Sequence, residues 1–81
     1  MTRLSVEIRA IWDPDAGVWT ATSDDVPGLV TEGETIDDVI ERAKQVIPEL
    51  LEFNHVDVGA KPVDIPVHVV ADYRDSVRIS G

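Results

Sequence analysis

The chain has 81 residues, enough for a single small domain with one core and too few for a second. Sixteen Asp and Glu residues against seven Lys and Arg residues give a formal net charge of −9, which argues against direct binding of the DNA or RNA polyanion. The absence of cysteine excludes disulfides and Cys-based zinc sites.

The N-terminal part of the chain predicts a β-hairpin. Apolar and polar side chains alternate over residues 3–12, which is the period that a half-buried strand requires. Residues 13–17 favour a turn, because proline presets one turn dihedral and the closing glycine accepts a positive φ. Residues 18–22 are rich in β-branched and aromatic side chains and form the return strand. Trp12 and Trp19 flank the turn, where core or turn packing is favoured over a role as exposed binding anchors.

A loop and a short third strand lead into the predicted helix. Residues 23–28 form the loop, because Pro27 has no backbone N–H to donate to a neighbouring strand and the following glycine permits a tight reversal of the chain direction. Residues 29–32 are the third strand. Thr35 is suited to cap the helix, with Asp38 three residues later completing a short variant of the capping box. One apolar stripe at helical spacing should lie on the sheet and consists of Ile36, Val39, Ile40, Ala43, Val46, Ile47, Leu50 and Leu51.

The second half of the chain predicts an interrupted helix and a last strand. Pro48 lies inside the helical pattern at a cost of about 3 kcal/mol, so we expect a kink or a break there. Residues 54–61 are a connecting loop. Alternation over residues 65–73 then predicts a fourth strand, whose start is confined to a sheet edge by Pro62 and Pro66.

The order of elements is β-β-β-α-β. We therefore predict an α+β fold of two layers in one domain, residues 1–81, with one helix on an antiparallel meander and a fourth strand at the edge. The tail, residues 74–81, is polar apart from Val77 and Ile79 and should extend or fray.

Negative charge is concentrated in one part of the sequence. Between Arg9 and Arg42 there is no Lys or Arg, but there are nine carboxylates. Such a surface would accelerate the encounter with a cationic protein, although solubility alone is an alternative explanation. The candidate partner-binding residues are Asp24, Asp25, Glu32, Glu34, Asp37, Asp38 and Glu41.

Catalytic chemistry is a weaker interpretation of the same residues. Asp24, Asp25, Glu32 and Glu34 are candidates for a metal-dependent hydrolase or nuclease, but neighbouring acids in a loop do not ensure convergence on one ion. His55 and His68 are isolated, and no nucleophile–base spacing or phosphate-binding loop is present. We therefore predict no catalytic residues, metal or cofactor. A third interpretation is a structural subunit or a small-ligand binder with a pocket between helix and sheet.

The segment from Asp25 to Asp38 resembles the HicB-like antitoxin family, with Asp-x-Pro-Gly, then Gly-acid-Thr, then an acidic helix start. Residues 10–13 and 17–24 are similar to a small stand-alone bacterial relative of that family whose function is unassigned. The resemblance spans about residues 4–73. Its structural motif comprises Trp12, Gly17, Trp19, Pro27, Gly28, Gly33 and Thr35.

The resemblance implies a degraded RNase H-like fold without catalysis, and a role as inhibitory partner of a small basic RNA-cleaving toxin. The chain lacks the C-terminal DNA-binding segment of longer members, so autorepression is not expected. We expect a non-enzymatic, cytoplasmic protein-binding module, because no signal peptide or membrane span can be drawn. We also expect a homodimer, since a small core is marginal and two sheet edges would be open.

Overall fold

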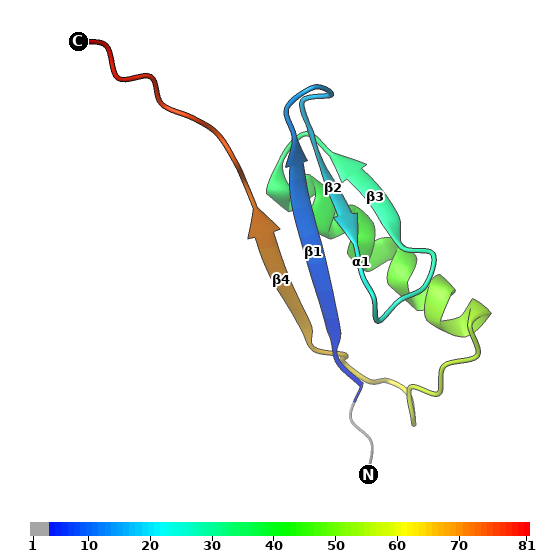
Figure 1. The fold of residues 1–81 in the computed structure, drawn as a ribbon. Coiled ribbons are helices and arrows are strands. Elements are labelled where there is room, and N and C mark those ends of the chain that lie inside the picture. Colours follow the sequence, from blue (N-terminus) through cyan, green and yellow to red (C-terminus); the bar gives the residue numbers. More distant parts are fainter. Residues whose placement is uncertain (1–3) are drawn as a thin grey trace.

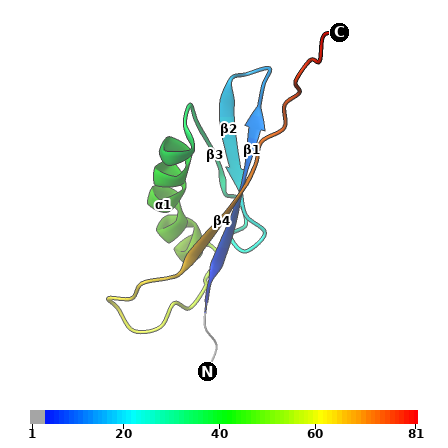
Figure 2. The same cartoon turned by 90° about the vertical axis from the view of Figure 1, so that its left-hand side faces the viewer.

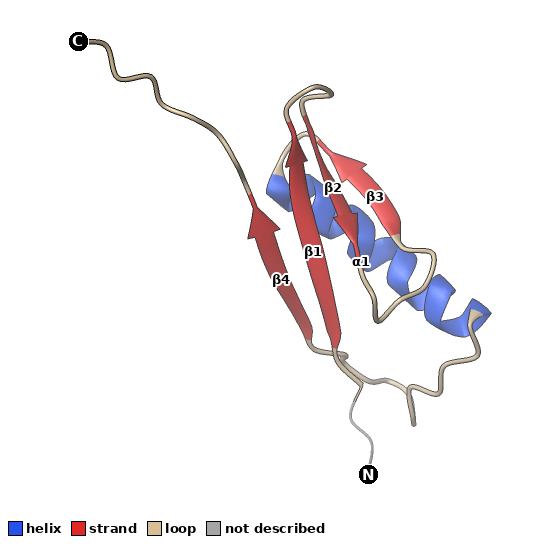
Figure 3. Ribbon diagram, viewed as in Figure 1, coloured by secondary structure: helices blue, strands red, loops and turns tan. Residues whose placement is uncertain are grey.

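The computed structural model describes residues 4–81, in which four strands and one helix form two layers. Strands β1 (Val6–Asp13), β2 (Val18–Thr22) and β3 (Val30–Gly33) precede helix α1 (Ile36–Phe53), and β4 (Val67–Asp72) follows it. The sheet order is β3-β2-β1-β4 (Figures 1 and 3). The pairs β1–β2 and β2–β3 are antiparallel and β1–β4 is parallel. The predicted α+β meander with a fourth strand at the edge is therefore confirmed.

The hairpin turn has the predicted chemistry. Gly17 has a φ of 68°, and its N–H donates to the carbonyl of Asp13 at 2.8 Å. The Asp13 carboxylate accepts from the N–H groups of Asp15 and Ala16 at 3.0 and 3.3 Å. A residue with a Cβ would be strained at that φ, so the glycine lets the hairpin close.

Strands β3 and β4 begin later than predicted. β3 begins at Val30, because the N–H of Leu29 donates to the carbonyl of Val26 at 3.1 Å and Leu29 is still part of the turn. β4 begins at Val67, after Pro66, which contributes a carbonyl but no N–H to the sheet. The predicted start of the first strand at residue 3 lies outside the described residues.

Helix α1 does not break at Pro48. It continues to Phe53, and Pro48 itself is exposed. Ile47 and Leu51 are both buried against the sheet, so packing on either side of the proline holds the helical path although one backbone hydrogen bond is lost.

The core lies between the helix and one face of the sheet. Even-numbered residues of β1 point toward the helix, and the predicted apolar stripe of α1 packs on them, as expected. Figure 2 shows the helix on one face of the sheet, and it packs chiefly on β3 and β2. The buried apolar side chains are Val6, Ile8, Ala10, Ala21, Val26, Leu29, Val39, Ala43, Ile47 and Leu51.

The helix lies off-centre on the sheet, so β4 is less covered than the other strands. Along β4 only Val69 and Asp72 are partly buried, and the remaining side chains are exposed. Within residues 4–81, no helix has the length and apolar character needed to cross a lipid bilayer.

Candidate functional site

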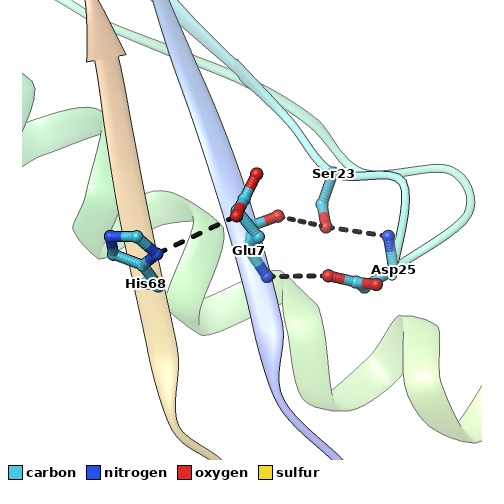
Figure 4. A network of polar contacts seen from close by, with 4 residues as sticks. All are labelled: Glu7, Ser23, Asp25 and His68. Carbon is cyan, nitrogen blue, oxygen red and sulfur yellow. Dashed lines mark hydrogen bonds and ion pairs between the residues drawn. The ribbon is translucent and has the colours of Figure 1, made fainter.

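Side chains of the loop between β2 and β3 form hydrogen bonds with the backbone of β1, at a place where β2 no longer pairs with it. β2 ends at Thr22, opposite Arg9, so Glu7 has no backbone partner on that side. The Asp25 carboxylate accepts from the Glu7 N–H at 2.8 Å, and the Ser23 hydroxyl donates to the Glu7 carbonyl at 2.6 Å (Figure 4). The N–H of Asp25 donates to the same hydroxyl at 3.1 Å. Ser23 and Asp25 therefore satisfy both backbone groups of a strand residue.

This network gives Asp25 a structural task. Asp24, beside it, is exposed and shares a shallow polar hollow of about 290 Å³ with Glu7, Arg9 and Asp25. The hollow therefore holds a guanidinium as well as three carboxylates. Across residues 4–81, no group of three or more His, Asp or Glu side chains is placed to hold a metal ion.

The acidic start of α1 forms a second group, separate from the loop. Glu34, Asp37, Asp38 and Glu41 are all exposed. The Asp38 N–H donates to the Thr35 hydroxyl at 3.1 Å, which confirms Thr35 as the helix cap. The β2–β3 loop and the helix start lie at opposite ends of β3 (Figure 1), so Asp24 and Asp25 do not join this group.

Glu32 lies apart from both groups. It pairs with Thr20 in the sheet, while its neighbours Thr31 and Gly33 face the helix. Side chains alternate across a strand, so Glu32 points to the opposite, uncovered face. The seven predicted partner-binding residues are therefore distributed over three places, and the largest collection is at the helix start.

An aromatic cluster joins the hairpin to the end of the last strand. The Trp12 and Trp19 rings are 5.5 Å apart, and each lies 6.0 Å from the Tyr73 ring. Trp12 and Trp19 are opposite each other in the β1–β2 register, and both are half-buried. Packing at the turn is thus what the structure shows for both tryptophans. The sequence did not identify Tyr73 as a member of this cluster. The position of Tyr73 beside Trp12 depends on the parallel register of β1 and β4.

Tyr73 also makes a polar contact that alters its titration. Its hydroxyl donates to the Asp75 carboxylate at 3.2 Å. That hydrogen bond, together with the negative charge of Asp75, raises the pKa of Tyr73 above its usual value of 10.0. Both effects favour the protonated phenol over the phenolate.

Replacing Asp75 with Asn should therefore lower the pKa of Tyr73. Tyr73 is the single tyrosine of the chain, so phenolate absorbance in an alkaline titration measures this group directly. Asp64→Asn removes the same charge ahead of the opposite end of β4 and should leave the titration unchanged. Equal midpoints for wild type and Asp75→Asn would contradict the assignment.

The sequence did not identify the residues that line an apolar groove of this structure. The groove has a volume of about 860 Å³ and lies between the C-terminal half of α1, residues 55–65 and the start of β4. Its apolar walls include Leu51, Val56, Val63, Ile65 and Val67. The exposed and half-buried apolar residues at 56, 58, 63 and 65 were the available signal, since a purely solvated loop rarely carries so many.

Together these features define a small acidic α+β domain with a helix on one sheet face and a sheet edge on either side. The chain belongs to a family described as a domain of unknown function, DUF1902, whose model matches residues 5–80. It is similar to hypothetical protein TTHA1013 from the extremely thermophilic bacterium Thermus thermophilus, known from a crystal structure. The two are 36% identical over 93% of this chain and 99% of that chain, with a TM-score of 0.65. No curated protein matches the chain.

Proposed function

We propose that this protein is a non-enzymatic, cytoplasmic binding module, similar in role to the HicB-like antitoxins, that self-associates and engages a small basic RNA-cleaving protein. The observation that carries the proposal is the exposed acidic group at the start of α1, formed by Glu34, Asp37, Asp38 and Glu41. Within residues 4–81, Glu41 is the member of this group that forms an ion pair, with 3.2 Å between its Oε1 and the Nζ of Lys44.

The charges of this group are largely unused by the fold. The Thr35 hydroxyl caps α1. The carboxylates of Asp37 and Asp38 stabilise the helix through its dipole, and each exposed acid in a first turn contributes about 0.3–1 kcal/mol in this way. Their negative field therefore remains available to a cationic surface. It would raise the association rate with such a surface and disfavour anionic competitors.

The positions of Asp24 and Asp25 in the β2–β3 loop make the proposed recognition surface smaller than the full predicted set of acidic residues. Asp25 is bonded to the backbone of β1, and Asp24 lies beside Arg9 in the polar hollow. The primary contact surface that we propose is therefore the helix start, rather than the full stretch from Asp24 to Glu41.

The first test is co-purification with the protein products of the two adjacent genes. We expect a basic product to form a stable complex, detected by light scattering, and to lose RNA-cleaving activity when it is bound. If neither neighbour encodes a basic protein that binds this chain, the proposal is wrong.

The second test removes charge from the helix start. The triple variant Asp37→Asn, Asp38→Asn, Glu41→Gln should weaken the complex roughly 10- to 100-fold, since three exposed charge contacts are lost. The matched control Glu49→Gln, Glu52→Gln, Asp64→Asn removes three charges at the other end of α1 and should bind within a few-fold of wild type. Circular dichroism checks that both variants keep the helix. If the two triple variants weakened the complex equally, net charge and not this surface would govern binding.

A further inference from the structure

The C-terminal arm, residues 74–81, extends away from the folded body. The molecule measures 62 × 23 × 18 Å with a radius of gyration of 15.6 Å. A compact domain of this length has a radius of gyration of about 12 Å. Figure 1 shows the arm continuing from the end of β4 into open space. Within the described residues, no hydrogen bond joins the arm to any residue before Asp72.

The arm carries apolar side chains that the monomer leaves in water. Val77 is 82% exposed and Ile79 is 84% exposed. They stand at alternate positions and belong to the odd-numbered series Val67, Val69, Ala71 and Tyr73, which only Asp75 interrupts. An extended arm therefore places them on the same side as that series. A strand pattern without a pairing strand indicates that the partner strand is supplied from elsewhere.

The outer edge of β4 is the matching surface. β4 pairs with β1 along one edge, so alternate backbone N–H and C=O groups of β4 point away from β1 without a strand beside them. The odd-numbered residues of β4 lie opposite Val6, Ile8 and Ala10, and so face the helix side. This is the part of the sheet that α1 does not cover.

We propose that the arm of one copy pairs antiparallel with β4 of a second copy, and that the two arms exchange about a two-fold axis at Tyr73. In this register Val77 lies opposite Val69 of the second copy, and Ile79 lies opposite Val67. The two sheets join into one of eight strands, with both helices on the same face. The arrangement deepens the self-association of the proposed function and does not depend on the basic partner.

Charge selects this register over its neighbours. An axis at Tyr73 places Asp72 of each copy opposite Arg74 of the other, and the two already attract within one chain at 3.2 Å. An axis at position 72 would set two Asp72 carboxylates face to face, and an axis at position 74 would do the same with two guanidinium groups. Opposite charges across a strand pair stabilise it, whereas like charges destabilise it.

The apolar groove continues this interface. Val67 forms part of its wall, together with Val63 and Ile65. Ile79 of the second copy would reach the groove where β4 begins. Exposed apolar side chains of the arm and exposed apolar walls of the groove thus cover each other in one assembly.

Light scattering on the full chain tests the exchange. We expect wild type to have twice the chain mass, and Val77→Asp with Ile79→Asp to raise the dimer dissociation constant at least about 100-fold, because two apolar contacts per arm are replaced by buried charge. Both side chains are exposed in the single copy, so the variant should keep the circular dichroism spectrum of a folded domain. The matched control Ser76→Asp with Ser80→Asp adds the same charge to the other side of the arm and should remain dimeric.

Single cysteines test the register in a chain that has none of its own. Tyr73→Cys should form a disulfide-linked dimer under mild oxidation, because only position 73 would meet itself within bonding distance. Arg74→Cys should crosslink far less. A monomeric wild type would overturn both the arm exchange and the proposed self-association. A dimer that persists with Val77→Asp and Ile79→Asp would overturn the arm exchange alone, and preferential crosslinking at position 74 would overturn the register.

Discussion

Replacing Ile8 with alanine should lower the free energy of unfolding by about 2–5 kcal/mol. Ile8 is fully buried in the middle of β1, where it faces α1. Truncation removes apolar area from the core and leaves a cavity that close-packed neighbours fill poorly. A domain of this size has a total stability of only about 4–12 kcal/mol, so the loss is a large part of it. Urea denaturation followed by tryptophan fluorescence measures the change.

Ile11→Ala provides the matched control in the same strand. Ile11 faces the other side of the sheet and is 45% exposed. Its truncation removes the same atoms from a partly solvated position, so the cost should be under about 1 kcal/mol. Similar losses for the two variants would show that the helix-facing side of β1 is not the principal core.

Replacing Gly33 with alanine should also destabilise the fold, by about 1–3 kcal/mol or more. Gly33 ends β3 where the chain turns into α1 and is buried there. An added Cβ would lie 2.6 Å from the backbone nitrogen of Val39 and 3.0 Å from its Cα. Because the obstacle is helix backbone, no side-chain rotation relieves the overlap, and α1 must move away from the sheet. The thermal midpoint Tm and the urea midpoint should both fall.

Gly17→Ala separates steric overlap from backbone strain. Gly17 has a φ of 68°, but an added Cβ would meet nothing within 4 Å. The expected cost is the strain of a left-handed residue, about 1 kcal/mol. If Gly33→Ala proved no more destabilising than Gly17→Ala, the close approach of the first helical turn to β3 would be disproved.

The elements of the fold were largely predictable, because each depends on local patterns. Alternation identified β1, and β-branched and aromatic content identified β2. The helical spacing of Val39, Ala43 and Ile47 identified the face of α1 that packs on the sheet. Pro48 was weighed by its local cost alone, which suggested a kink or a break. Burial of Ile47 and Leu51 outweighs that cost, and burial is a property of the assembled structure.

The candidate site was less predictable, because nearness in sequence does not imply nearness in space. Asp24 and Asp25 are close in sequence to Glu32 and Glu34, yet the three sites are separate in space. Asp24 and Asp25 precede β3, Glu32 lies within it on the uncovered face of the sheet, and Glu34 follows it at the helix start. The use of Asp25 as a substitute strand partner for Glu7 follows from where β2 stops. No local sequence pattern predicts the residue at which β2 ends.

Charge and hydrophobic period are carried by the residues themselves, so the acidity of the chain, the order of its strands and helix, and the buried faces of β1 and α1 could be predicted without the structure. Tertiary structure alone decided the β1–β4 register, the Trp12–Trp19–Tyr73 cluster, the division of the carboxylates into separate groups and the exposure of the arm. Those features depend on contacts between residues distant along the chain. Such contacts arise only when the strands and the helix pack together.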